Sequence, residues 1–373
     1  MNKTIVGFVS VLALGPVATV HAEPPVTLPT TEARARPAID IVPIYLSGRR
    51  ALAVLRIGDH PPAPVVFDTG TSGNDMDSDY AAVTGLDYDP QVHVRVEDGT
   101  GNSFEAKQAI IPVASLGGVP LRQSTATVFP YKERDVVGIF GPTSFSGRQV
   151  LVDLGKGRLI VRDRSFEAAY GGVPYGKDDL PRINVQIAGK SYQALLDSGS
   201  DSDLLLPETL SRKLSLTGPL KVVGKARTVS GDRNVYEGKL KGSVKIGHIV
   251  LHNPTVRFSG KQANVGLPII RQLQILLDPE RRKSWIVEPK PLAPAKLLEF
   301  AGRFGIRTLR AEKGALVFQR DDRPAYKLTY LGNDLFRFEE SGELLQFWRT
   351  KEQVNAMDLV SSDGDVIHAD RTR

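Results

Sequence analysis

Two aspartates, Asp68 and Asp197, stand in nearly identical sequence surroundings. Three apolar residues precede each one, and a small hydroxyl residue and a glycine follow it: Val65-Val66-Phe67-Asp68-Thr69-Gly70 and Ala194-Leu195-Leu196-Asp197-Ser198-Gly199. In such a pattern an apolar strand ends at an Asp and the chain then turns sharply. Glycine permits the turn because it tolerates backbone angles that other residues resist. Two carboxyl groups held close together share one proton, so one can act as general base and the other as general acid in a hydrolysis. A single copy would fit an ordinary turn equally well, so the recurrence is what points to chemistry.

The similarity between the two halves of the chain extends far beyond the tripeptides. Each Asp ends a predicted β-hairpin, and each motif is followed by the same series of features. These are a short helix (78–83 and 207–214), a hairpin with a polar, glycine-containing tip (92–111 and 225–246), an apolar stretch broken by glycine (136–142 and 263–270) and a closing hairpin (149–161 and 274–287). So many features in the same order indicate a duplicated β-rich unit.

The paired Asp-Thr-Gly and Asp-Ser-Gly motifs, with the features that follow them, resemble the aspartic proteases over roughly residues 39–289. The halves are short and contain no cysteine, so they look closer to retroviral-type subunits fused in tandem than to large pepsins. Asp201 in the second motif is typical of the retroviral type, whereas Ser72 at the same place in the first motif is similar to the pepsins. The resemblance implies an all-β fold with two aspartic-protease-like β-barrel lobes in one chain.

The resemblance assigns Asp68 and Asp197 as the catalytic pair that activates a water molecule. The roles belong to the pair, so neither Asp is assigned individually as the base or the acid. Thr69 and Ser198 are expected to hydrogen bond across the lobes and to hold the two loops together.

Other residues of the motifs are expected to support this pair. The resemblance implies that Gly70 and Gly199 allow close approach of the two loops and offer backbone N–H groups to the carboxylates. It also gives Ser72 a hydrogen bond to the Asp68 side chain.

Three further residues are expected to face a substrate. By the same resemblance, Asp201 would contact the backbone of a bound peptide. Gly99 and Gly231 lie at the tips of the two predicted hairpins, which look like flaps over an extended peptide. In pepsins one flap carries a Tyr near its tip, and the tip at 98–101 has none, which leaves the hydrogen-bonding role of this flap unassigned.

The first 22 residues are typical of a secretory signal peptide. Lys3 gives a positive start, the apolar run at 5–14 is too short to span a bilayer, and residues 20–22 form a small-x-small ending. A membrane anchor is the less favoured alternative. Together with the lack of cysteine, a signal peptide suits a periplasmic or secreted protein with no stable membrane insertion after signal cleavage.

Composition changes mark the remaining boundaries. Residues 23–37 are rich in Pro and Thr and are predicted to be a linker, and a Gly- and Pro-rich stretch at 166–181 separates lobes at 38–165 and 182–289. Beyond a Pro-rich boundary, residues 295–373 are predicted to form a small antiparallel β-domain for packing or partner binding. Its strand-like runs are 315–319, 326–330, 334–338, 344–348 and 356–360.

Other candidate sites have simpler interpretations. Asp75, Asp77 and Asp79 are spaced as in a calcium loop, but the Gly and Glu that should follow are missing, so a polar turn and helix cap is favoured. His248 and His252 would share a strand face without a third ligand, which favours surface histidines. We therefore expect no metal and no cofactor.

No nucleic-acid partner is expected, although the chain is basic. The chain carries a formal net charge of +6 and has a pI near 9.3, which implies mild attraction to anionic surfaces. The tightest basic cluster, 281–283, is better explained as a solvated turn, because no nucleic-acid motif accompanies it.

The sequence as a whole favours a monomeric aspartic endopeptidase that acts on peptides or proteins, because both lobes are present in one chain. One alternative is a peptide-binding protein of the cell envelope on the same scaffold, with weak or no catalysis. Another is an envelope interaction protein whose C-terminal domain is the functional part.

Overall fold

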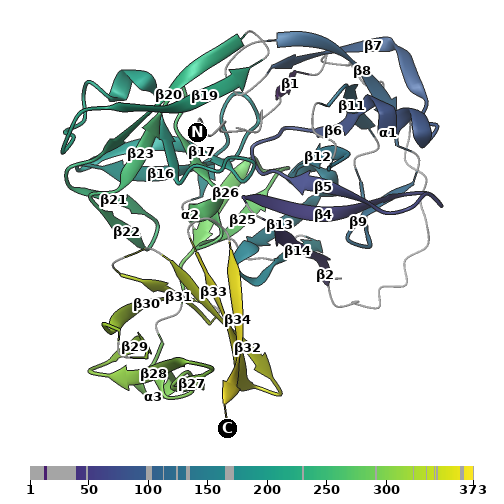
Figure 1. Ribbon diagram of the computed structural model, residues 1–373. Coiled ribbons are helices and arrows are strands. Elements are labelled where there is room, and N and C mark those ends of the chain that lie inside the picture. Colours follow the sequence, from purple (N-terminus) through teal and green to yellow (C-terminus); the bar gives the residue numbers. More distant parts are fainter. Residues whose placement is uncertain are drawn as a thin grey trace.

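The computed structural model shows a mostly β protein, with 58% strand and 8% helix, which confirms the all-β prediction. It describes residues 12–14, 39–47, 49–97, 103–111, 113–122, 125–131, 135–163, 172–228, 231–289, 292–321, 323–332, 334–339, 341, 343–361 and 365–372. Two β-rich lobes lie side by side, and a small barrel lies below them (Figure 1). No helix among these residues is long and apolar enough to cross a membrane.

The first lobe is an eleven-stranded sheet in the order β1-β7-β8-β11-β6-β12-β5-β4-β9-β10, with β3 paired to β4. The short helix α1 (Ser78–Val83) forms where it was predicted. The strands are β1 (Leu12–Leu14), β3 (Tyr45–Ser47), β4 (Arg50–Ile57), β5 (Ala63–Phe67), β6 (Asn74–Asp77), β7 (Tyr88–Glu97), β8 (Ser103–Ile110), β9 (Ala114–Leu116), β10 (Val119–Pro120), β11 (Thr125–Phe129) and β12 (Gly138–Phe140).

Strand β1 belongs to the segment predicted to be a signal peptide, and it pairs antiparallel with residues 95–97 of β7. The rest of that segment and the predicted linker at 23–37 lie outside the described residues.

The second lobe is a nine-stranded sheet in the order β19-β20-β23-β18-β24-β17-β16-β21-β22. Its strands are β16 (Arg182–Ile187), β17 (Lys190–Asp197), β18 (Leu204–Leu206), β19 (Lys221–Thr228), β20 (Gly231–Lys239), β21 (Ser243–Ile246), β22 (Ile249–His252), β23 (Thr255–Phe258) and β24 (Asn264–Gly266), and α2 (Leu267–Ile270) follows the last one.

Two predicted elements of the second lobe differ from the structure. The helix predicted at 207–214 is only the 3-10 turn η3 (Glu208–Leu210), because Leu216 soon bridges to Leu240 and draws the chain into an extended conformation. The hairpin predicted at 225–246 ends at Lys239, and β21 pairs with β16 in the lobe instead.

A third sheet joins the lobes. Its six strands run in the order β15 (Val173–Pro174), β26 (Lys283–Val287), β25 (Gln274–Asp278), β13 (Arg148–Asp153), β14 (Arg158–Asp163) and β2 (Ile39–Pro43). The predicted closing hairpin of each lobe therefore pairs with that of the other lobe. At the centre Leu151 faces Leu276, its own counterpart in the second half, so the two hairpins are related by an approximate two-fold axis.

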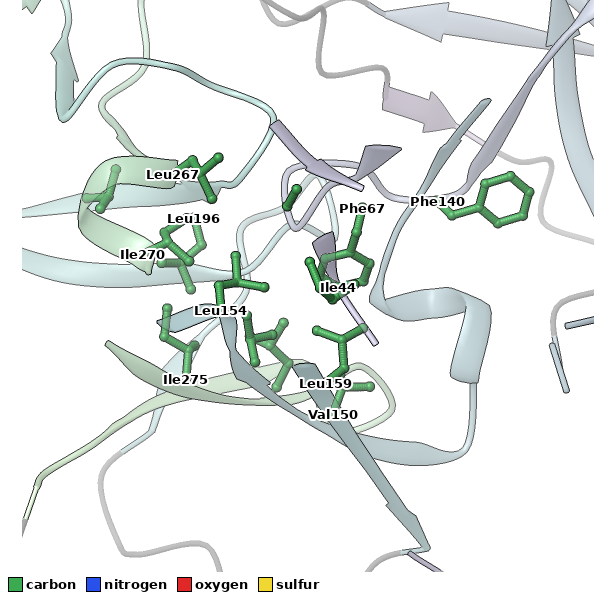
Figure 2. Close-up of a cluster of buried hydrophobic side chains, with 14 of the residues drawn as sticks. Ile44, Phe67, Phe140, Val150, Leu154, Leu159, Leu196, Leu267, Ile270 and Ile275 are labelled. Atoms are coloured by element: carbon green, nitrogen blue, oxygen red, sulfur yellow. The ribbon is translucent and has the colours of Figure 1, made fainter. Parts of the chain in front are cut away.

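One continuous hydrophobic core runs through both lobes and the shared sheet. Figure 2 shows its centre, where Phe67 and Leu196, the residues before the two aspartates, lie among side chains of the shared sheet such as Val150 and Ile275. The 3-10 turns η1 (Pro142–Phe145) and η2 (Leu154–Lys156) flank β13 and add Phe145 and Leu154 to this core. Both aspartates are thus anchored to a single packed body.

The C-terminal domain is a closed antiparallel barrel of eight strands. After helix α3 (Pro294–Leu297), these are β27 (Gly302–Phe304), β28 (Arg307–Glu312), β29 (Ala315–Arg320), β30 (Tyr326–Gly332), β31 (Leu335–Phe338), β32 (Leu344–Thr350), β33 (Gln353–Val360) and β34 (Val366–Thr372). The prediction contained five strands and missed β27, β28 and β34. They are short or carry many charged and exposed residues, so the apolar alternation that marks a half-buried strand is weak in them.

Phenylalanine rings fill the barrel, and part of its surface docks on the lobes. Its core contains Phe300, Phe304, Phe318, Phe336, Phe338 and Phe347. Leu331, Leu335 and Leu344 of the barrel belong instead to the core shared by the lobes. Arg271 donates to the Ser361 carbonyl at 3.1 Å, which ties the barrel to the end of α2.

Candidate active site

The two aspartates stand at equivalent places in the two lobes. Asp68 follows β5, whose last residue Phe67 lies beside Phe140 of β12, and Asp197 ends β17, where it lies beside Gly266 of β24. In both lobes the neighbouring strand runs parallel, which fixes the direction of the loop that leaves the Asp. Both side chains are buried. The structure thus places each predicted carboxyl group at the end of a rigid central strand.

A reciprocal set of hydrogen bonds clasps the two loops together, as the resemblance implied. The Thr69 backbone N–H donates to Ser198 Oγ at 2.9 Å, and the Ser198 backbone N–H donates to Thr69 Oγ1 at 3.1 Å. Each hydroxyl in turn donates into the other lobe, Thr69 Oγ1 to the Leu196 carbonyl at 2.8 Å and Ser198 Oγ to the Phe67 carbonyl at 3.0 Å. Every donor and acceptor crosses between the lobes, so the clasp brings the two motifs into a single site.

The glycines hold the carboxyl group of Asp68 from both lobes. The N–H groups of Gly70 and Gly199 donate to Asp68 Oδ1 at 2.7 and 3.0 Å. A Cβ atom on Gly199 would lie only 2.6 Å from Asp68 Oδ2, so only glycine fits at this position. Asp68 Oδ2 is buried and makes no hydrogen bond with any described residue. One oxygen of Asp68 is therefore fixed by the protein, and the other is left for a reacting group.

Burial raises the pKa of Asp68 from 3.8 to about 6, although the N–H groups of Gly70 and Gly199 oppose the increase by favouring the charged form. A carboxyl group with this pKa keeps its proton in mildly acidic solution. It can therefore serve as a proton donor there, as a shared-proton pair requires.

The structure reveals a third acid near the pair that the sequence analysis did not include in the site. Asp75 lies on β6 and is buried, and burial raises its pKa well above the usual range, with a further increase from the nearby charge of Asp68. Hydrogen bonds from the hydroxyls of Thr71 and Thr127 oppose this increase.

A polar turn and helix cap was predicted for Asp75, Asp77 and Asp79. The prediction is right for only part of this segment. Asp77 Oδ1 caps α1 by accepting from the N–H groups of Asp79 and Tyr80 at 3.0 and 3.2 Å, and Asp79 is exposed. Asp75 is instead a buried strand residue, on the face of β6 opposite Met76. The two-residue period of a strand at 74–77 could have indicated this.

A second residue that was missed is Asn264 on β24. Its amide nitrogen Nδ2 donates to Asp197 Oδ2 at 2.8 Å. Residues 263–270 were predicted to be an apolar stretch broken by glycine, and the single amide within that stretch was the available signal.

Asp201 lies between two arginines. Arg49 of the first lobe contacts its Oδ2 at 2.8 Å, and Arg257 of the second lobe contacts its Oδ1 at 3.0 Å. Both carboxylate oxygens are thus held by ion pairs, one of which crosses between the lobes. Ser72, at the corresponding place in the first lobe, is half-buried.

The two predicted flaps are long hairpins on the side of the molecule away from the barrel (Figure 1). In the second lobe Gly231 faces Thr228 at the tip of the β19–β20 hairpin, as predicted. In the first lobe β7 and β8 form the hairpin, and its tip with Gly99 lies outside the described residues.

Among the described residues, no cluster of three or more His, Cys, Asp or Glu side chains is arranged to hold a metal. His252 is exposed, but the prediction of a surface position is wrong for His248, whose side chain is only 13% exposed. It lies near Glu288, at 3.7 Å from Nδ1 to Oε2, and near Arg337 of the docked barrel.

Comparison with known families supports the resemblance for the second lobe. The sequence model of the aspartyl protease family matches residues 183–267, from β16 to the first residue of α2. No curated protein matches the chain. The matched segment contains Asp197, Ser198 and Gly199 together with Asn264. Residues 183–267 form a retropepsin-like domain of the aspartyl protease family.

Proposed function

We propose that the protein is an aspartic endopeptidase that hydrolyses peptide bonds with a water molecule activated by Asp68 and Asp197. The observation that carries the proposal is the hydrogen bond from Gly199 of one lobe to the Asp68 carboxylate of the other. This bond links the two motifs directly, which supports a site in which two carboxyl groups share a proton.

The proposed reaction needs one ionised and one protonated carboxyl group. The ionised member takes a proton from water while the water oxygen bonds to the carbonyl carbon, and the protonated member gives its proton to the carbonyl oxygen. In the collapse of the resulting diol the C–N bond breaks. The departing nitrogen takes the proton that the first carboxyl group removed from water, and a hydroxyl of the diol returns a proton to the other carboxylate. Because the N–H groups of Gly70 and Gly199 are already oriented, Asp68 needs no reorganisation during these steps.

The proposal also covers the substrates, the oligomeric state and the location of the enzyme. Its substrates would be peptides or proteins bound in extended form beneath the two hairpins. Both lobes belong to one chain and are joined by the shared six-stranded sheet. We therefore propose a monomer whose activity per molecule does not change with protein concentration. The signal-like first 22 residues support a periplasmic or secreted location.

Cleavage of a mixture of unfolded proteins tests the proposal, measured from acidic to mildly alkaline pH for the wild type, Asp68→Asn and Asp197→Asn. We expect the wild type to cut in acid and to lose activity as the pH rises through about 6, where the shared proton is lost. Both variants should be inactive. If the wild type cuts at no pH, or if the variants match it, the proposal is wrong. An inactive Asp68→Asn variant that still binds peptides would show that the substitution removes catalysis and leaves substrate binding intact.

A further inference from the structure

The strands beside the two aspartates differ at one equivalent position. On β12, Ile139 lies beside Val66, two residues before Asp68, and on β24, Asn264 lies beside Leu195, two residues before Asp197. Ile139 packs in an apolar cluster. Asn264 therefore places an amide where the duplicated framework accommodates an apolar side chain.

The buried Asn264 amide is unfavourable for stability, but it is placed to donate a hydrogen bond to a carboxylate. Asn264 is 9% exposed and lies between the buried Ala263 and Val265. Its Oδ1 atom is buried and has no hydrogen-bond partner in the part of the chain that the structure describes, which is unfavourable for stability. Among the described residues, its side chain makes one hydrogen bond, from Nδ2 to Asp197 Oδ2 at 2.8 Å.

The backbone around Asn264 holds this donor in place. Strand β24 lies between β17 and β18 in the middle of the lobe sheet, and the Leu195 N–H donates to the Ala263 carbonyl at 2.8 Å. The amide therefore reaches Asp197 from a strand that is paired on both sides.

We propose that Asn264 is a positioning residue that orients the carboxylate of Asp197 and stabilises its ionised form, so that Asp197 takes the proton from water and Asp68 supplies the acid. This inference rests on the proposed function and goes beyond it by dividing the two roles. An N–H donor favours the charged form of a carboxyl group, because the neutral form accepts the bond less strongly.

The surroundings of Asp68 support the opposite role for that residue. It has Ile139 in place of the amide, and burial raises its pKa to about 6, which favours the protonated form in mildly acidic solution. Both backbone N–H groups that hydrogen bond to Asp68 donate to Oδ1, which leaves Oδ2 available to carry the shared proton.

The decisive variant is Asn264→Ile, which introduces the side chain that the first lobe has at this position. The acid limb of the pH profile of kcat/KM reports ionisation of the base in the free enzyme. We expect this limb to move to higher pH by about one unit in Asn264→Ile, with about a tenfold loss of kcat/KM below it. The alkaline limb should stay in place. Ile139→Val, an apolar change at the matching position beside Asp68, should leave both limbs unchanged.

Asn264→Asp provides a second variant of nearly the same shape, in case the isoleucine disturbs folding. It replaces the N–H donor by a like-charged group, so the acid limb should move at least as far in the same direction. An acid limb that is unchanged in both folded variants would overturn the inference while leaving the protease assignment intact.

A measurement without substrate separates the inference from the proposed function. Carbon-13 NMR of the labelled protein follows the titration of the Asp197 carboxyl group directly. We expect its midpoint to lie about one pH unit higher in Asn264→Ile than in the wild type. Equal midpoints would overturn the inference, whereas a wild type that cleaves nothing but shows this shift would overturn only the protease assignment.

Discussion

The two lobes share a framework but surround their aspartates with different chemistry. In each lobe a central strand leads to the Asp. The neighbouring strand runs parallel to it and leads to a glycine. The first lobe places Ile139 and the buried acid Asp75 near Asp68, whereas the second places Asn264 against Asp197. The duplicated backbone thus decides where the two carboxyl groups stand, and a few side chains on the flanking strands decide how each one ionises.

The largest difference that mutation should reveal concerns two equivalent glycines. A Cβ atom on Gly266 would lie 1.9 Å from the backbone oxygen of Ser202, which cannot move without shifting the loop between β17 and β18. A Cβ atom on Gly141 would first meet a side-chain methyl of Thr71 at 2.6 Å. We expect Gly266→Ala to lower the free energy of unfolding by about 4 kcal/mol and Gly141→Ala by about 2 kcal/mol in urea titrations. Equal losses would show that the two turns are packed alike.

The clasp between the lobes should give the next largest effect. Ser198→Ala removes the acceptor for the Thr69 N–H and the donor to the Phe67 carbonyl, and leaves both groups buried without a partner. We expect a loss of about 2 to 3 kcal/mol in the free energy of unfolding, and a fall in kcat because the loops separate. Thr69→Ser keeps the hydroxyl and serves as the control. A stable and fully active Ser198→Ala would contradict the account of the clasp.

Asp75→Asn tests the acid that distinguishes the first lobe. The folded protein keeps the proton on Asp75 at pH values where the unfolded chain has lost it, so the contribution of this group to stability falls as the pH rises above about 4. An amide of the same shape can still accept hydrogen bonds from Thr71 and Thr127 without carrying a charge. We expect Asp75→Asn to match the wild type in acid and to be about 1 kcal/mol more stable at neutral pH.

Thermal unfolding of both proteins at the two pH values would measure this difference. A gap between them that does not change with pH would contradict the assignment of Asp75 as a buried acid that holds its proton.

The sequence allowed the strands that carry the motifs to be predicted, because their apolar residues and the duplicated order are local signals. The shared sheet could not be predicted in the same way. A hairpin such as 149–161 has the same apolar pattern whether it folds onto its own lobe or pairs with its counterpart, and only the three-dimensional arrangement decides this.

The polar neighbours of the pair were missed for a related reason. Asp75 sits in a segment rich in acids whose other members form the predicted cap, and Asn264 is one amide in an apolar stretch. Their importance depends on contacts with Asp68 and Asp197, which come from other strands. The clasp of Thr69 and Ser198, by contrast, was predicted because both residues lie within the recurring motifs.

The central claim is that carboxyl groups from two lobes act as one unit. Its most direct test compares the peptide cleavage rates of Asp68→Asn, Asp197→Asn and the double variant at a mildly acidic pH. Residues that act as a unit are strongly non-additive, so we expect each single change to lower kcat by at least about a thousandfold and the double variant to be no slower than either single one. A double variant that loses the product of the two single effects would show independent groups and contradict the shared-proton site.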